Sequence, residues 1–488
     1  MDKKGTEETM NRVILCGAGK RCRVLCHILQ NAYFEIVAIL DNDSDKWGTM
    51  LEGYQISPLE RIGDYQDIQW CITVGDRLAF EEIKNEIQLK CQAGLGNEIS
   101  YNEIILKSYR ANSRINKYIL GKNVYKNEKE SILFDCGNGL VLGGVEAWTM
   151  DVCEALINEG KESTYIISDN GIYDVSHILE KHIIPVNISH EERFEEKTVL
   201  NIIEAIIKKL PAKIVTSSTD EIMLAAHLVK CHYPDMVEVI SVIHNSNENV
   251  YKDYIDFKDC SDLYIGVSQD IRNEMIQKGI EPEKIYSMTC PFVCEPILNR
   301  NYSNVNDPLC IGYAGRMDGM EHSQKRMDLL LKLMKILKER NVYCKFELAG
   351  DGAVRHIMEE FVSSNDLYEN VIFLGRLERS EMAVFWKRQD ICVNLADYEG
   401  RSISIIEAMG NGAVPIVTAT SGVKEDISDS INGYIVPLGD YHAMADRIEH
   451  LAQHRELLFQ MGKLAHDAVY PKSLMKEHID FWNDIFRK

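Results

Sequence analysis

The sequence predicts an α/β protein built from parallel sheets that helices cover on both faces. Short apolar runs of strand length, such as 237–243 and 371–374, alternate with longer segments of helical character along the chain. Glycines follow several of these runs, as at Gly315 and Gly350, where they permit close approach of the backbone to a ligand. Alternation of this kind is typical of parallel sheets. Because 488 residues exceed what one hydrophobic core usually supports, we expect two or three domains.

The first part of the chain has the layout of a nucleotide-binding βαβ unit. An apolar strand runs into the turn Gly17-Ala-Gly19 and a helix, and the next strand ends at Asp41. The glycines permit a tight turn, the helix N-terminus suits phosphate, and the acidic residue suits ribose. Gly17, Gly19 and Asp41 therefore form a candidate nucleotide site. Cys22 stands where the dinucleotide pattern has its third glycine, so a purely structural domain is an equal alternative.

A basic segment at 104–127 follows this unit and contains no acidic residue. Its cations are Lys107, Arg110, Arg114, Lys117, Lys122 and Lys126. One interpretation is an amphipathic surface that touches a membrane or a polyanion. The other, which we favour, is a linker helix with a solvated basic face that packs between two acidic domains.

A second α/β unit begins with the strand at 131–135 and a glycine-rich loop that ends at Gly143 and Gly144. His244 follows the apolar strand at 237–243 in the same unit. Ligands of parallel sheets bind at the carboxyl ends of the strands, where the loop and His244 both fall. We therefore expect the glycines and His244 to face one crevice.

The last α/β unit carries the most informative pattern in the chain. A buried strand at 391–396 precedes Glu399, and the helix predicted at 402–409 carries Glu407. The N-terminus of that helix offers free N–H groups and a positive dipole end, which suit phosphate. A carboxylate on each side of a phosphate suits a molecule with hydroxyls at both ends, such as a nucleotide sugar. From spacing alone, an acidic loop followed by a helix with one solvated Glu is an equal alternative.

Composition excludes several classes of function. The net charge of −21 argues against nucleic acid, because phosphate backbones need a basic face, and it disfavours broad attachment to anionic membranes. No apolar run is long enough to span a membrane, and the first residues lack the apolar core of a signal peptide, so we expect a cytoplasmic protein. The 14 cysteines form no Cys-x-x-Cys pair, which favours reduced, buried thiols over a metal site.

Seven ordered motifs resemble one enzyme family. Glu399 and Glu407, ahead of Ala-Met-Gly-x-Gly-x-x-Pro-Ile-Val417, are similar to the Glu-x7-Glu signature of the retaining family-4 glycosyltransferases, which have the GT-B fold. The other pieces, in family order, are Gly143-Gly144-Val-Glu146, His244, Gly315-Arg316 with Lys325, Leu348-Ala-Gly-Asp-Gly352, Phe373-Leu-Gly375 and Asn432-Gly-Tyr-Ile-Val436. Together they span about residues 130–488.

The resemblance implies an architecture of two Rossmann-like domains with a cleft between them. A third Rossmann-like domain precedes them, similar to domains that bind nucleotide sugars ahead of sugar acyltransferases. The expected parts are a nucleotide-binding-type domain at 1–120, a linker at 121–130, an acceptor domain at 131–300 and a donor domain at 301–471, with 472–488 packing back on the acceptor domain.

The resemblance also assigns roles to residues. It implies that Glu399 contacts the hydroxyls of the donor sugar, that His244 lies over the sugar, and that Arg316 and Lys325 neutralise the departing diphosphate. Glu407 would bind the nucleotide ribose. The other expected donor-binding residues are Gly143, Gly144, Asp351, Gly400, Arg401, Ser402 and Ile403.

Two departures from the family pattern concern the sugar rather than the reaction. Arg326 replaces the usual Gly after the phosphate-binding Lys325, and Gly400-Arg401-Ser402 replaces the usual Gly-Phe-Gly. Arg401 is therefore expected to add a contact to the donor or the acceptor.

The predicted function is retaining transfer of a sugar from a UDP- or GDP-sugar to a glycan, lipid-linked or protein acceptor, as in bacterial polysaccharide or glycoconjugate synthesis. No metal or other cofactor is expected. Peripheral contact of 104–127 with the inner face of a membrane and oligomerisation are both compatible with the sequence. The alternatives are a catalytically weak transferase-like binding subunit and a nucleotide-sugar 2-epimerase.

Overall fold

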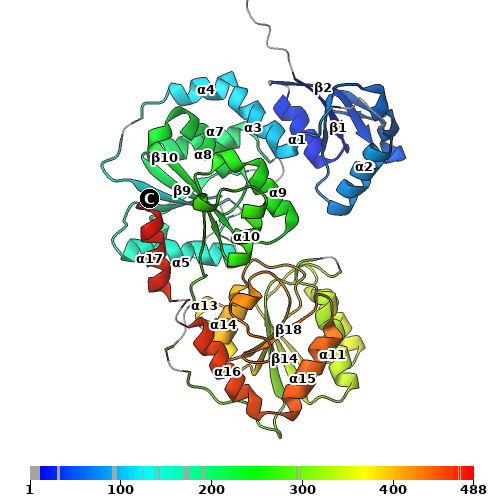
Figure 1. Ribbon diagram of the computed structural model, residues 1–488, viewed down its shortest axis with the longest axis vertical. Coiled ribbons are helices and arrows are strands. Elements are labelled where there is room, and N and C mark those ends of the chain that lie inside the picture. The colour runs from blue at the N-terminus through cyan, green and yellow to red at the C-terminus, as the bar shows by residue number, and fades with distance from the viewer. Residues whose placement is uncertain are drawn as a thin grey trace, which may run out of the picture.

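The computed structural model describes residues 11–29, 33–90, 96–124, 126–137, 139–140, 143–169, 175–188, 193–292, 295–296, 298–321, 323–470, 472 and 474–488. Its elements form three α/β units in chain order, which follow one another from blue to red in Figure 1. The predicted α/β class with parallel sheets is confirmed. Among the described strands, the pair β3 and β4 alone is antiparallel.

The first sheet has the order β3-β4-β2-β1-β5. Its strands are β1 (Asn11–Cys16), β2 (Phe34–Asp41), β3 (Met50–Leu51), β4 (Tyr54–Pro58) and β5 (Gln69–Ile72), and its helices are α1 (Lys20–Leu29) and α2 (Arg77–Lys90). Gly17 joins β1 to α1 at a φ of +105°, a conformation that L side chains rarely adopt. The turn that the sequence predicts is therefore present, and it needs this glycine.

The second sheet has the order β12-β11-β10-β9-β6-β7-β8. Its strands are β6 (Ser131–Cys136), β7 (Thr164–Asp169), β8 (Ile183–Val186), β9 (Ala212–Thr216), β10 (Val237–Ile243), β11 (Leu263–Gly266) and β12 (Ile285–Ser287). Its helices are α5 (Gly144–Asn158), α6 (His177–Glu180), α7 (Glu196–Ile207), α8 (Glu221–His232), α9 (Glu248–Asp256) and α10 (Gln269–Gln277). Strand β10 lies inside the sheet and is almost wholly buried, which explains its unbroken apolar character.

The third sheet has the order β15-β14-β13-β16-β17-β18. Its strands are β13 (Leu309–Ala314), β14 (Cys344–Ala349), β15 (Val371–Gly375), β16 (Ile391–Asn394), β17 (Val414–Thr418) and β18 (Tyr434–Val436). Its helices are α11 (Met327–Glu339), α12 (Arg355–Ser364), α13 (Arg379–Lys387), α14 (Ile403–Gly410), α15 (Tyr441–Gln453) and α16 (Glu456–Val469). The short helix after Glu399 thus begins and ends one residue later than the sequence predicts.

Helices α3 (Tyr101–Ala111) and α4 (Ser113–Leu120) join the first unit to the second. Both pack against α8, and their apolar residues, such as Ile105 and Ile115, are buried. The Tyr118 hydroxyl donates to Glu204 Oε2 at 2.6 Å, and Lys122 pairs with the same carboxylate at 3.2 Å. This packing matches the linker interpretation of the basic segment, because its apolar face lies against the protein.

The chain finally returns to the second unit. After α16, helix α17 (Met475–Ile485) packs against α5, and Figure 1 shows this red helix beside the second sheet. Trp482 of α17 is fully buried, with its ring centroid 5.7 Å from that of Phe134 on β6. The last residues therefore complete the core of the second unit.

Candidate functional site

Glu399 and Lys325 form the centre of the candidate site. Glu399 lies in the loop between β16 and α14, and Lys325 lies just before α11. Lys325 Nζ is 2.5 Å from Glu399 Oε1, and the two side chains are only 17% and 9% exposed. Asn394 and Gln324 each place an amide nitrogen 3.5 Å from the same carboxylate. A charged pair with little access to water interacts strongly, so these two side chains fix each other's position.

His244 approaches this centre from the opposite unit. A Cβ atom at position 400 would overlap the carbonyl group of His244, so only glycine lets the two loops approach this closely. The hydroxyl of Ser246 also donates to the carbonyl oxygen of Glu399 at 2.5 Å. Residues 244–246 of the second unit and 399–400 of the third are therefore in direct contact, as parts of one site must be.

The imidazole of His244 is held by two neighbours. Its Nε2 lies 3.2 Å from the hydroxyl of Ser217, which follows β9, and its ring makes an edge contact with Trp148 of α5 at 4.8 Å between centroids. Burial lowers the pKa of His244 to about 3, and nearby His478 contributes in the same direction. The ring is therefore neutral at pH 7.

Two helix N-termini meet at the same place. Helix α5 begins at Gly144 and α14 at Ile403, and a Cβ at Gly144 would lie 3.6 Å from the side chain of Ile403. The residues that precede them, Gly143 and Ser402, provide no side-chain cap. The carboxylate of Glu146 lies beside Gly143 at the start of α5, whereas Ser402 leaves the first amide groups of α14 available to an anion. The macrodipoles of both helices favour negative charge there.

Arg316 adds an exposed positive charge to the site. It follows β13, its side chain is 61% exposed, and its Nη1 lies 3.1 Å from Asp318. Burial raises the pKa of Glu146, in the first turn of α5, while the charge of Arg316 opposes that rise. The charge of Arg316 thus acts on the first turn of α5, and its exposed fork can bind a phosphate.

Glu407 lies on α14, whereas Glu399 lies in the loop before this helix. Burial raises its pKa to about 7, and the neighbouring cation of Arg379 opposes the rise. Arg379, at the start of α13, also forms an ion pair with Asp151 of α5 in the second unit. A carboxyl group with a pKa near 7 that lies beside a cation can accept hydrogen bonds from hydroxyl groups such as those of ribose.

Asp351 and its glycines line the next loop. Gly350 and Gly352 have φ values of +137° and +157°, and a Cβ at Gly350 would overlap the carbonyl group of Gly315. The side chain of Asp351 accepts a hydrogen bond from its neighbour Gly352 at 2.8 Å and is 57% exposed. The loops after β13 and β14 therefore pack together and leave Asp351 accessible.

Arg401 has a different environment from the one the sequence predicts. Its side chain is 3% exposed, with Nη2 2.6 Å from Asp426 and Nη1 3.6 Å from Glu425. A guanidinium that is buried against two carboxylates is occupied, so this geometry favours a role in holding the loop after Glu399 over direct contact with donor or acceptor. The hydroxyl of Ser402 lies 3.5 Å from the side chain of Asn394 at the end of β16 and 3.1 Å from the hydroxyl of Ser404 in α14.

The backbone conformation at Arg326 explains why the family pattern has a glycine at this position. Its backbone is left-handed, with a φ of +49°, and its guanidinium binds Asp328 and Asp397 at 3.0–3.1 Å. Glycine adopts this conformation readily, whereas arginine adopts it at a cost that these ion pairs offset.

The predicted N-terminal site is already occupied by the protein's own groups. Asp41 is 2% exposed, and it accepts hydrogen bonds from the backbone N–H groups of Ala18 at 2.5 Å and Asp43 at 2.8 Å. Lys46 Nζ lies 3.2 Å from the same carboxylate. Asp41 therefore ties the turn between Gly17 and Gly19 to β2, and a ribose would have to displace these bonds.

The sequence did not reveal several residues that shape the site, namely Arg379, Asp151, Ser217, Trp148 and His478. Ser217 could have been found, because it follows a parallel strand and ligands of such sheets bind at the carboxyl ends of the strands. The others act through contacts between distant segments, which no local pattern encodes.

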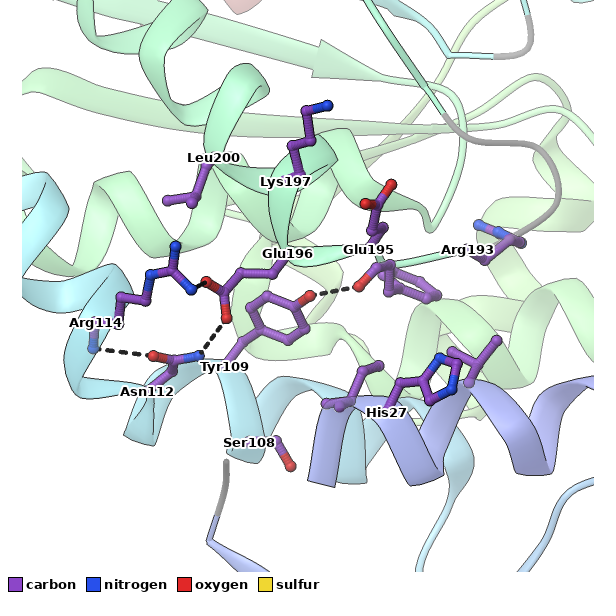
Figure 2. Close-up of a pocket in the computed structure, with 13 residues that line it drawn as sticks. His27, Ser108, Tyr109, Asn112, Arg114, Arg193, Glu195, Glu196, Lys197 and Leu200 are labelled. Atoms are coloured by element: carbon purple, nitrogen blue, oxygen red, sulfur yellow. Dashed lines mark hydrogen bonds and ion pairs between the residues drawn. The ribbon is translucent and has the colours of Figure 1, made fainter. Parts of the chain in front are cut away.

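A separate pocket of about 460 Å³ lies at the junction of α1, α3 and the start of α7, and contains none of the predicted site residues. Figure 2 shows His27, Tyr109, Asn112 and Glu196 around it. Within the described ranges, no group of three or more His, Cys, Asp or Glu side chains is arranged to hold a metal ion. The helices described here include none of sufficient length and apolarity to cross a membrane.

Part of the chain is similar to known glycosyltransferases. Residues 299–467 match the family described as Glycosyl transferases group 1, and residues 9–93 match the family described as C2185-like, N-terminal. The chain is 25% identical over 163 residues to the poly(ribitol-phosphate) alpha-N-acetylglucosaminyltransferase of Staphylococcus aureus, which is 33% of each chain. It is 22% identical over 275 residues to the N-acetyl-alpha-D-glucosaminyl L-malate synthase of Bacillus anthracis, covering 54% of this chain and 71% of that one.

Solved structures show the fold of the larger part. A variant of S. aureus TarM, in complex with Fondaparinux, alpha-GlcNAc-glycerol and UDP, superposes with a TM-score of 0.60 at 12% identity, over 74% of this chain and all of the other. Anabaena HepE, in complex with UDP and glucose, gives a TM-score of 0.60 at 14% identity with the same coverage. The predicted GT-B fold is confirmed, and a further α/β unit with a mostly parallel sheet precedes it.

Proposed function

We propose that this protein is a retaining glycosyltransferase that moves a sugar from a nucleoside-diphosphate sugar to a hydroxyl of a glycan, lipid-linked or protein acceptor. The observation that carries the proposal is the Lys325–Glu399 ion pair, in contact with the His244 loop of the opposite unit. The loops that carry a cation, a carboxylate and a neutral imidazole meet there, and helices α5 and α14 begin beside them.

The hard step in such a reaction is departure of the diphosphate from the anomeric carbon. Negative charge grows on the leaving phosphate while the sugar gains oxocarbenium character. Fixed cations and amide groups beside the phosphate stabilise that charge more in the transition state than in the ground state. Arg316, Lys325 and the first amide groups of α5 and α14 are assigned to this role.

The remaining roles follow from polarity and position. Glu407 is assigned to the ribose hydroxyls and Glu399 to the hydroxyls of the donor sugar. The neutral ring of His244 is assigned to the face of the sugar near the reacting carbon. Asp351, being exposed at the end of β14, is assigned to the nucleoside side of the donor.

The nature of donor and acceptor is drawn from the neighbours. TarM and HepE were both solved with UDP, which supports a UDP-sugar as donor, with a GDP-sugar as the alternative. The names of the relatives describe transfer to a polymer of ribitol phosphate and formation of a malate glycoside. We propose a bacterial polysaccharide or glycoconjugate as acceptor, and we assign the N-terminal unit a regulatory or acceptor-docking role.

A transferase-like subunit without activity, or a 2-epimerase, would retain the fold. Incubation with a panel of UDP- and GDP-sugars tests the proposal, with thermal stabilisation and release of nucleoside diphosphate as the two readouts. Slow hydrolysis of one donor, with stabilisation by the same donor, is expected. Stabilisation without hydrolysis or transfer would indicate the inactive subunit, and conversion to an epimeric sugar would indicate the epimerase.

A further inference from the structure

A cluster of buried aromatic rings connects helix α17 to His244. Trp148 of α5 is 1% exposed, and His478 and Trp482 of α17 are 3% and 0% exposed. His478 and Trp482 are four residues apart, so they lie on the same face of α17. This face packs against α5, which carries Trp148.

Both indole N–H groups donate to a single nitrogen. The Nε1 atoms of Trp148 and Trp482 each lie 3.1 Å from Nε2 of His478. An imidazole nitrogen accepts hydrogen bonds only when it carries no proton, so His478 must be neutral with its proton on Nδ1. Burial lowers the pKa of His478 to about 3, while a backbone hydrogen bond to Thr289 opposes that change.

The opposite side of Trp148 meets the candidate site. Its ring makes the edge contact with His244 described above, at an interplanar angle of 66°. Phe134 packs against both tryptophans, with centroid distances of 6.1 Å and 5.7 Å. Since buried indole rings cannot shift without breaking these contacts, the orientation of Trp148 limits the positions open to the His244 ring.

We propose that His478 is a positioning residue for His244, acting through Trp148: by accepting both indole N–H groups, it fixes the ring against which His244 is oriented over the donor sugar. This inference rests on the proposed function, because His244 matters for rate only if it faces a reacting sugar. Helix α17 would then determine the orientation of His244, which lies more than 200 positions earlier in the chain.

His478→Phe tests this, because it keeps an aromatic ring and removes the acceptor. We expect kcat to fall about tenfold or more, with the KM for the nucleotide sugar within about twofold, since the donor-binding loops are untouched. His478→Gln supplies an acceptor oxygen and should recover most of the lost kcat. Ile485→Ala is the matched control, because Ile485 is buried on the same helix and touches none of these hydrogen bonds.

Rates are compared at a temperature well below the lowest midpoint of thermal unfolding among the variants. Trp148→Phe breaks the same link from the other side, so it should lower kcat similarly and add little to His478→Phe in a double variant. It also keeps the proposal testable if His478→Phe does not fold. An unchanged kcat in the folded variants, or an equal loss of kcat in Ile485→Ala, would overturn the inference.

One further variant separates this inference from the proposed function. His244→Ala should abolish most transfer. If it does while His478→Phe and Trp148→Phe leave kcat unchanged, the positioning role is wrong and the proposed function stands. If His244→Ala itself transfers sugar at the wild-type rate, the role of His244 in the proposed function is wrong, and the inference fails with it.

Discussion

Lys325 Nζ lies 2.5 Å from Glu399 Oε1, so the cation and the carboxylate assigned to the donor neutralise each other in the unliganded protein. In the proposed function, a diphosphate that enters the site would compete with Glu399 for Lys325, and the donor sugar would offer hydroxyl donors to Glu399 in return. In the proposed function, the pair would therefore join recognition of the sugar to stabilisation of the leaving group. Removing one partner leaves the other as a buried charge without an ion-pair partner, which lowers the stability of the protein.

Arg316→Ala and Lys325→Ala should each lower kcat about 100-fold or more, because each removes a preorganised charge that stabilises the departing diphosphate. Steady-state transfer assays measure the loss, with Lys335→Ala on the exposed face of α11 as control. Since Lys325 and Glu399 are in contact, the double variant Lys325→Ala with Glu399→Gln should lose less than the product of the single losses. Activity within a few-fold of wild type in both single variants would reject the assignment.

The two glutamates should separate in calorimetry. Glu407→Gln should weaken binding of the free nucleoside diphosphate as well as of the nucleotide sugar, because the ribose is common to both. Glu399→Gln should leave affinity for the nucleoside diphosphate nearly intact and reduce transfer. Titration of both variants with nucleoside diphosphate is the measurement, and equal losses of affinity would contradict the division of roles.

Glu407 should also make stability depend on pH. Burial raises its pKa from 4.5 to about 7, so its contribution to stability is complete below pH 4.5 and is lost as the pH rises to about 7. The Glu407→Gln variant has no charge to bury. As the pH rises from 4.5 to 8, its free energy of unfolding should therefore increase relative to that of wild type by up to about 3 kcal/mol. Urea denaturation of both proteins across this range measures the difference, which a pH-independent result would contradict.

Retention of configuration has a direct readout. The diphosphate oxygen, held by Lys325 and the helix N-termini, is expected to help deprotonate the acceptor on the same face of the sugar. An α-linked donor should therefore give an α-linked product. Proton NMR of the anomeric signal of the first product tests this, and a β linkage would exclude a retaining mechanism.

Truncation should distinguish two boundaries for the N-terminal unit. A chain that begins at residue 96 keeps α3 and α4 on α8 and should fold and cleave donor, because the transferase motifs lie beyond residue 137. A chain that begins at 128 exposes the surface that Ile105, Tyr109 and Ile115 cover, and it should aggregate or unfold at lower temperature. Circular dichroism melting of both chains tests this; equal stability would place the boundary after α4.

The N-terminal unit itself, residues 11–90, should show whether Asp41 binds ligand. The carboxylate of Asp41 binds Ala18, Asp43 and Lys46. If Asp41→Ala abolishes nucleotide-sugar binding while the thermal unfolding midpoint of the unit is unchanged, Asp41 binds the ligand. If the midpoint falls as well, the loss reflects the turn.

Local patterns predicted much of this fold. The strand β10 and the short helix α14 were found because burial makes a strand continuously apolar, and because glycines and a proline mark the ends of short elements. The placement of Glu399 in a loop at the carboxyl end of β16 followed from the same signals.

What the sequence could not predict depends on contacts between distant segments. Arg401 looked available for a ligand, yet Asp426 and Glu425 come from another loop and bury its guanidinium. The contact between Gly144 and Ile403 likewise arises only when two units close on each other, and the meeting of Trp148 with His478 only when the chain returns to the second unit. Residue type indicates which chemistry is possible, whereas tertiary packing decides which groups remain free to perform it.

The return of α17 to the second unit has a consequence for engineering. Because the third unit is inserted between β12 and α17, exchanging it for that of another enzyme needs two crossover points, one between Ser287 and Leu309 and one between Val469 and Met475. A hybrid joined at a single point after β12 would import a foreign terminal helix against the native α5. Libraries that recombine sugar specificity in this scaffold should therefore treat α17 as part of the host.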